Sequence, residues 1–278
     1  MASMPSILNS PRPIRVYTLG TFAVEREGDA NPVLHGRCAD LLKAIVALGP
    51  GPVSIDQLAA ALWNLAEGDA AHNALEVTVH RLRKSLGAFE SILVHDRRIR
   101  LAPDLCWVDC YEFEASCGQS PASQSFEDAQ RAVALYRGAL YQSEAEQAWM
   151  LVARARLHNR FVRTIERIAD LAQADGAKAL AVFRHALTIE PLNEAFQLGL
   201  FRALVHAGRI AEALDTYRRF ENLTRASTGI APSNHLTTRI AELVPCLHQI
   251  KQTETTEAAK RGSRWSHLTA SSTRSVVH

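Results

Sequence analysis

The sequence lacks the features of secreted, membrane-spanning and disulfide-bonded proteins. No stretch approaches the roughly 20 consecutive apolar residues of a membrane-spanning helix, and residues 1–13 contain no apolar core of signal-peptide length. The five cysteines include no C-x-x-C pair, so they indicate neither a disulfide framework nor a zinc knuckle. We expect a cytoplasmic protein with scattered reduced thiols; the alternative is a metal or redox cluster of Cys106, Cys110 and Cys117.

The motifs of common enzyme classes are also missing. The sequence contains no P-loop, no G-x-S-x-G nucleophile turn and no glycine-rich nucleotide-binding turn. It shows no receiver domain with an acidic phosphorylation pocket. We therefore predict a protein that is not an enzyme and that uses no cofactor and no metal ion.

Residues 69–86 have the pattern of one amphipathic helix, with Asp69 as the expected N-cap and Gly87 as the stop. Four apolar side chains recur at helical spacing and predict a narrow buried stripe: Leu75, Val79, Leu82 and Leu86. Seven other side chains are predicted to face outward: Asn73, Val77, Thr78, His80, Arg81, Arg83 and Lys84.

These outward side chains are of the types that read DNA, since Arg pairs with guanine, Asn pairs with adenine, and Val or Thr methyl groups contact the thymine methyl group. We predict that four of them read bases, Asn73, Val77, Thr78 and Arg81, and that three contact the DNA backbone, His80, Arg83 and Lys84. The formal net charge is only +2, but basic residues outnumber acidic ones between residues 70 and 100. Two alternatives remain: a basic cluster that only complements the helix dipole, and a metal site formed by His72, Glu76 and His80.

The flanking segments predict a winged helix. Residues 14–25 alternate as two short strands around a Gly-Thr turn, and two helices follow over residues 37–48 and 54–63, the second opened by a capping box. Residues 91–101 predict a hairpin with a charged tip, and residues 105–109 are expected to pair beside it. In such a fold the third helix enters the major groove and the hairpin, or wing, reaches the backbone, so we predict backbone contacts by Arg97 and Arg98.

From about residue 111 the pattern is helical only. Residues 178–184 align with residues 212–218 at an offset of 34, the tetratricopeptide period. We predict a mainly α fold with a small β component, a winged helix-turn-helix followed by an all-α tetratricopeptide-like domain. The expected divisions are a disordered leader (1–13), the winged helix (14–115), a Gly/Ser/Pro/Gln linker (116–125), the helical domain (126–250) and a disordered tail (251–278).

Several short motifs follow one another in the first half of the chain: Leu19-Gly-Thr-Phe22, Leu58-Ala-Ala-Ala-Leu-Trp63, Asn73-Ala-Leu75, Arg81-Leu-Arg83, Leu86-Gly87, and Trp107-Val-Asp109 with Phe113. In this order they resemble the bacterial antibiotic regulatory protein (SARP) type of transcriptional activator, which has an OmpR/PhoB-type winged helix. The second half resembles the bacterial transcriptional activator domain of the same family, so the resemblance covers about residues 14–247. The chain departs from the family in the wing, where Asp96-Arg97-Arg98-Ile99 stands in place of a usual glycine, and in residues 141–147, which replace a Gly/Pro loop.

The resemblance implies a sequence-specific activator that binds double-stranded DNA as a homodimer or tandem pair on direct repeats near promoters, and that is associated with the nucleoid when bound. It also implies contact with RNA polymerase through the loop between the second and third helices: Asn64, Leu65, Ala66, Glu67 and Gly68. The competing interpretation is a tetratricopeptide-type protein-interaction adaptor whose winged helix does not read DNA. Salt-dependent binding to duplex DNA separates the two interpretations.

Overall fold

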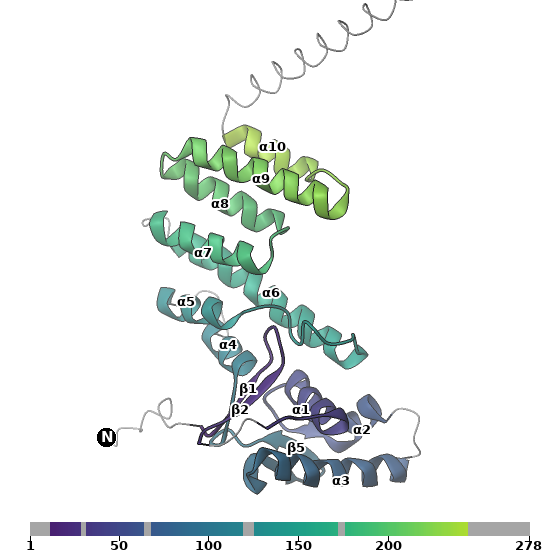
Figure 1. Cartoon of the computed structure of the whole chain (residues 1–278). Coiled ribbons are helices and arrows are strands. Elements are labelled where there is room, and N and C mark those ends of the chain that lie inside the picture. The colour runs from purple at the N-terminus through teal and green to yellow at the C-terminus, as the bar shows by residue number, and fades with distance from the viewer. Residues whose placement is uncertain (1–11, 29–31, 64–67, 119–124, 172–175, 244–278) are drawn as a thin grey trace, which may run out of the picture. The chain divides into compact units, whose positions relative to one another are not determined.

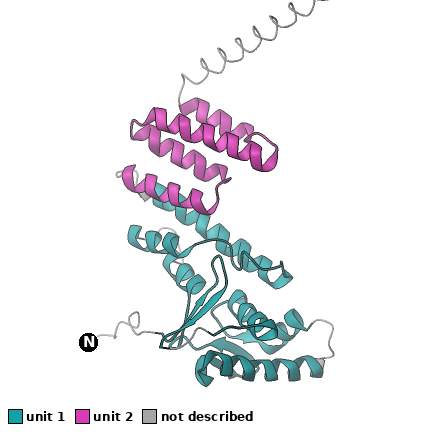
Figure 2. Cartoon of the chain, viewed as in Figure 1, with its two compact units in different colours: residues 1–174 teal, residues 175–278 magenta. Residues whose placement is uncertain are grey.

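The computed structural model describes residues 12–28, 32–63, 68–118, 125–171 and 176–243. The chain forms two compact units, residues 1–174 and residues 175–278 (Figure 2). Most of the predicted leader and all of the predicted tail lie outside the described residues.

The first unit opens with a sheet of order β2-β1-β6, made of β1 (Ile14–Tyr17), β2 (Ala23–Arg26) and β6 (Cys106–Val108). β1 pairs antiparallel with β2 and parallel with β6. The prediction that residues 105–109 pair beside the hairpin is therefore wrong. Ile14 N–H donates to the Leu105 carbonyl at 3.1 Å, and this bond begins the ladder that joins β6 to the N-terminal strand.

Three helices form the core of the winged helix: α1 (Gly36–Leu48), α2 (Ile55–Leu62) and α3 (Gly68–Leu86). α2 begins at the predicted capping box, in which Ser54 Oγ accepts from Asp56 N–H and the Gln57 side chain accepts from Ser54 N–H. α1 packs against both α2 and α3 (Figure 1). A second sheet of order β3-β5-β4 completes the fold: β3 (Val53–Ser54), β4 (Ile92–His95) and β5 (Arg98–Leu101).

Three further helices belong to the first unit: α4 (Asp109–Cys117), α5 (Phe126–Leu135) and α6 (Ala148–Leu171). Their core is aromatic, because the Tyr136 ring stacks on Phe161 with centroids 4.0 Å apart and also contacts Phe113. The division between units falls at residues 174 and 175, whereas composition had suggested residues 116–125. The helices on either side of that segment, α4 and α5, pack against each other, a contact that composition does not reveal.

The second unit contains α7 (Gly176–Ile189), α8 (Glu194–His206), α9 (Ile210–Thr228) and α10 (Asn234–Leu243). α8 packs against the other three helices. The Phe183 ring lies so close to Gly199 that an added Cβ would be 2.2 Å from it, so glycine allows α7 and α8 to approach. The mainly α architecture with two small sheets confirms the predicted fold class. No helix among the described residues has the length and apolar character needed to cross a membrane.

Candidate nucleic-acid interface

The predicted reading helix is α3, and one side of it is buried. The predicted apolar stripe is confirmed, since Leu75, Val79, Leu82 and Leu86 are each 5% exposed or less. The helix ends at Leu86, and Gly87 follows with φ of +69°, the left-handed conformation typical of helix ends. It begins at Gly68, so Asp69 lies in the first turn rather than at the predicted N-cap position.

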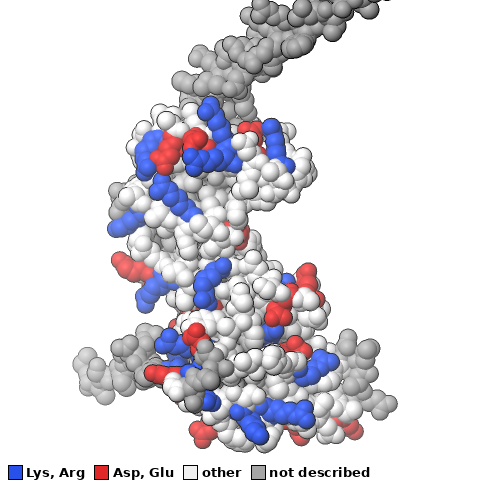
Figure 3. All heavy atoms as spheres, viewed as in Figure 1, with Lys and Arg blue, Asp and Glu red and all other residues white. Residues whose placement is uncertain are grey.

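Five exposed side chains recur at steps of one to four residues along the other side of α3 and form what we call the α3 face: Asn73, Val77, His80, Arg81 and Lys84. Residues three and four apart share one side of a helix. Val77 is 50% exposed although it is apolar. Figure 3 shows basic side chains over α3 on the side in view. An amide, a guanidinium, an ammonium group and an apolar side chain are thus presented together to solvent.

Thr78 does not belong to this face, and the prediction that it faces outward is wrong. It is only 6% exposed, and its Oγ1 donates to the Ala74 carbonyl at 2.7 Å. A threonine hydroxyl that bonds to the preceding helical turn needs no other partner, so the side chain can be buried beside Val79. Thr78 therefore widens the core of α3 and is not available to read a base.

Arg83 lies half-buried at the edge of α3 and is bonded within the chain. Its Nε and Nη2 donate to the Ile92 carbonyl at 3.1 and 2.6 Å, and its guanidinium lies 4.4 Å from the centre of the Phe89 ring. These contacts fasten the end of α3 to the start of β4. Arg83 thus has a positioning role that the sequence did not indicate, alongside its predicted contact with the DNA backbone.

The wing consists of β4 and β5, paired antiparallel with His95 opposite Arg98. Asp96 and Arg97 form its two-residue tip, and both have positive φ, 46° and 55°. This is the backbone of a type I′ turn, which favours Asn-Gly because other residues are strained there. Arg98 is exposed, and its Nη1 lies 3.5 Å from the Pro52 carbonyl oxygen.

Asp56, in the first turn of α2, joins three elements at one carboxylate oxygen. Its Oδ1 lies 2.8 Å from His72 Nε2 on α3 and 2.9 Å from Arg97 Nη2 at the wing tip. The hydrogen bonds from His72 and then Arg97 lower the pKa of the Asp56 carboxyl. His72 therefore contacts a carboxylate instead of joining Glu76 and His80 in the alternative metal site.

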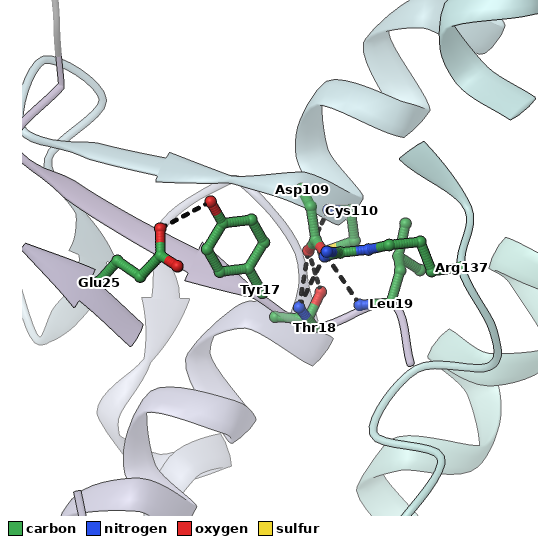
Figure 4. A network of polar contacts seen from close by, with 7 residues as sticks. All are labelled: Tyr17, Thr18, Leu19, Glu25, Asp109, Cys110 and Arg137. Carbon is green, nitrogen blue, oxygen red and sulfur yellow. Dashed lines mark hydrogen bonds and ion pairs between the residues drawn. The ribbon is translucent and has the colours of Figure 1, made fainter. Parts of the chain in front are cut away.

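A second aspartate, Asp109, lies inside the first unit and is fully buried (Figure 4). It accepts hydrogen bonds from the backbone N–H groups of Thr18, Leu19 and Cys110 and from Thr18 Oγ1, at 2.6 to 3.0 Å. Arg137 Nη2 lies 3.0 Å from Oδ2, and its guanidinium also covers the Tyr17 ring. We call these residues the Asp109 junction, because they connect the N-terminal sheet, α4 and the segment after α5.

Backbone pairing reinforces the Asp109 junction. Gly20 N–H donates to the Ala139 carbonyl, and Tyr141 and Gln142 N–H donate to the carbonyls of Thr18 and Gly20. A Cβ at Gly138 would lie 3.3 Å from Gly20 Cα and 2.2 Å from Gln142 Oε1, so the lack of a side chain at Gly138 lets the two chain segments touch. Tyr141 is fully buried there, and its hydroxyl donates to the Lys43 carbonyl in α1 at 3.1 Å. Motifs 90 to 120 residues apart in the sequence thus form one site.

The loop predicted to contact polymerase lies almost wholly outside the described residues, which resume at Gly68, the first residue of α3.

Two cysteines of the alternative metal or redox cluster have separate partners. Cys106 Sγ bonds to the Ser91 carbonyl, and Cys117 Sγ lies 3.4 Å from Thr164 Oγ1. Burial raises the pKa of Cys106 to about 12. Within the described parts of the chain, no three His, Cys, Asp or Glu side chains are grouped to hold a metal ion.

Residues 108–244 match the family described as the bacterial transcriptional activator domain. The transcriptional regulator RedD of Streptomyces coelicolor is 24% identical over 258 residues, which is 86% of this chain and 73% of RedD. The solved structure of Mycobacterium tuberculosis EmbR, in complex with a low-affinity phosphopeptide, has a similar fold. It is 21% identical, with a TM-score of 0.56, over 91% of this chain and 71% of EmbR.

The activator domain matched by residues 108–244 follows a winged helix, and the regulator relative spans most of the chain. Both findings agree with the resemblance that the motifs had indicated. Residues 108–244 therefore form a bacterial transcriptional activator domain, and the findings support the SARP type of transcriptional activator as the family that the chain resembles.

Proposed function

We propose that this activator binds double-stranded DNA in a sequence-specific manner, with α3 in the major groove and the wing at the backbone. The observation that carries the proposal is the α3 face, which presents polar and basic groups on a helix fixed by a buried stripe. Within the described residues, Arg81 and Lys84 form no ion pair that would hold them to the protein. Such groups are free to pair with an external ligand.

Asn73, Val77 and Arg81 are the base readers in this proposal, because they are exposed and of the types that match base edges. His80, Lys84 and Arg98 contact phosphates, and Arg97 and Arg83 do so from positions already bonded within the chain. Val77 fits base reading because its exposed methyl groups are of the kind that contact a thymine methyl group.

One reading helix covers only a short site, so we further propose that two copies bind direct repeats near a promoter, as a homodimer or tandem pair. The helical second unit offers an extended surface for such pairing. Contact with RNA polymerase through residues 64–68 completes the proposal. Through this contact the DNA-bound protein would activate transcription.

The first test selects bound fragments from a random duplex pool with the full chain and measures affinity at several salt concentrations. Sequence-specific binding should enrich one motif, and log affinity should fall by about 0.9 per phosphate contact for each unit of log salt. Duplexes with one and two copies of the motif should then differ in the steepness of binding. An adaptor that does not read DNA would enrich no motif and show no salt dependence, and this result would exclude the proposal.

A further inference from the structure

We infer that Asp56 is an internal competitor of DNA for the wing: its carboxylate occupies the Arg97 guanidinium that would otherwise bind a DNA phosphate. The inference rests on the proposed function and concerns the regulation of the same site. It assigns to Asp56 the role of setting affinity, which the sequence did not indicate.

The carboxylate lies where an anion would be bound. The Asp56 carboxylate lies where α2, α3 and the wing meet. Two nitrogen atoms, His72 Nε2 and Arg97 Nη2, lie within 2.9 Å of its Oδ1. A guanidinium and an imidazole converging on one oxygen would bind a phosphate oxygen in the same way. The positive end of the α2 dipole also lies in this first turn, while the Ile55 and Asp56 N–H groups are already bonded to the Arg97 carbonyl and to Ser54 Oγ.

The Asp56 side chain is not needed to hold the wing in place. Ile55 N–H donates to the Arg97 carbonyl at 2.9 Å, and β3 pairs with β5 through Val53 opposite Ile99. These backbone bonds position the wing tip whatever residue 56 is. What Asp56 controls is therefore the guanidinium of Arg97 and not the location of the wing.

The contact is also weak enough to be exchanged. The Arg97 and Asp56 side chains are 65% and 63% exposed, and exposed ion pairs are weak because water screens them. The lowered pKa of Asp56 keeps the carboxyl ionised at neutral pH, so the competing charge is always present. A DNA phosphate must displace it, and Asp56 thereby reduces the contribution of the wing to binding.

The experiment measures the affinity of the full chain for a duplex of arbitrary sequence, about 30 base pairs long, over a series of salt concentrations. The variants are Asp56→Asn, Arg97→Ala and the double variant. Asp69→Asn is the matched control, because Asp69 is an exposed acid in the first turn of α3 and no described contact links it to the wing. Thermal melting confirms that each variant is folded.

Asp56→Asn should raise affinity about three- to tenfold and steepen the salt dependence by about one phosphate contact. Arg97→Ala should cost less than about twofold in the natural chain, but should remove the whole gain in the Asp56→Asn background. Asp69→Asn should leave the cost of Arg97→Ala unchanged.

Four results would overturn the inference. If Arg97→Ala cost the same in both backgrounds, or if Asp69→Asn matched Asp56→Asn, Asp56 would act only as a general negative charge. If Asp56→Asn weakened binding, its carboxylate would position Arg97 for DNA. If neither the natural chain nor any variant bound the duplex, the proposed function would fail together with the inference, an outcome distinct from the other three.

Discussion

The Asp109 junction and the α3 face use their polar groups in opposite ways. At the junction a fully buried carboxylate accepts hydrogen bonds from four donor groups of Thr18, Leu19 and Cys110 and pairs with Arg137. On the α3 face, Arg81 and Lys84 stand in solvent without an ion pair among the described residues. A buried polar group needs hydrogen-bond partners within the protein, whereas an exposed polar group is hydrated and can exchange water for a ligand. Substitutions in the two regions should therefore have different effects.

The largest expected effect is on stability. Asp109→Ala removes a buried carboxylate and leaves three buried backbone N–H groups and Arg137 without their acceptor. We expect the free energy of unfolding of the first unit to fall by about 3 to 5 kcal/mol. Urea unfolding followed by tryptophan fluorescence measures it, because Trp63, Trp107 and Trp149 all lie in this unit. The exposed Asp104→Ala should change it by less than about 0.5 kcal/mol.

The next effect is on binding. Arg81→Ala on the α3 face should weaken binding to the selected motif by about 1 to 3 kcal/mol and relax the preference at one base position, without lowering stability. Repeating the selection with the variant identifies that position. Arg219→Ala in α9, an exposed arginine of the second unit, is the control and should alter neither quantity. An unchanged base preference in the Arg81 variant would show that the α3 face does not read DNA through this residue.

A smaller loss of stability is expected from a substitution that removes a single hydrogen bond at the Asp109 junction. Tyr141→Phe removes only the hydroxyl that donates to the Lys43 carbonyl, so the buried ring is kept. We expect a loss of about 0.5 to 1.5 kcal/mol in unfolding free energy, the usual value of one hydrogen bond. DNA affinity at temperatures where the variant is folded should equal that of the natural chain. A change in affinity would mean that the junction also orients the α3 face.

The smallest expected effect is at the wing tip. Arg97 has φ of 55°, a conformation that costs an L-residue about 1 kcal/mol and a glycine almost nothing. Arg97→Gly should therefore raise stability by about 0.5 kcal/mol after loss of the exposed contact with Asp56. Arg98→Gly, in the extended strand β5, should lower stability by a similar amount and serves as the matched control. If both variants are destabilised, the ion pair outweighs the strain of the turn.

Local patterns predicted the helices well, because their evidence lies within a few residues. The apolar spacing of Leu75 to Leu86 and the Ser54 capping box both appear in the structure as predicted. Thr78 was misplaced because its helical position lies at the border of the stripe, where the hydroxyl bond to Ala74 decides burial. The pairing of β6 with β1 and the position of Asp56 depend on contacts between distant segments, which no local pattern encodes.

The Asp109 junction likewise could not be predicted from local sequence patterns. The motifs containing Leu19 and Asp109 were visible in the sequence, but nothing in their spacing indicates that they meet each other or Arg137. Only the fold brings them together. The base-reading roles of Asn73, Val77 and Arg81 stay predictions, and their exposure on one face is what supports them.

The pairing of residues 18–20 with residues 139–142 also sets an order of events during synthesis. Residues 18–20, which directly follow β1, have backbone partners in a segment made after the whole of α5. Contacts so distant in sequence form slowly, and chains are extended by about 5 to 20 residues per second. The 32 residues from Asp109 to Tyr141 therefore delay completion of the winged helix by roughly 2 to 6 s. A nascent chain arrested before Tyr141 would carry α3 on a domain in which Thr18 and Gly20 still lack these backbone partners.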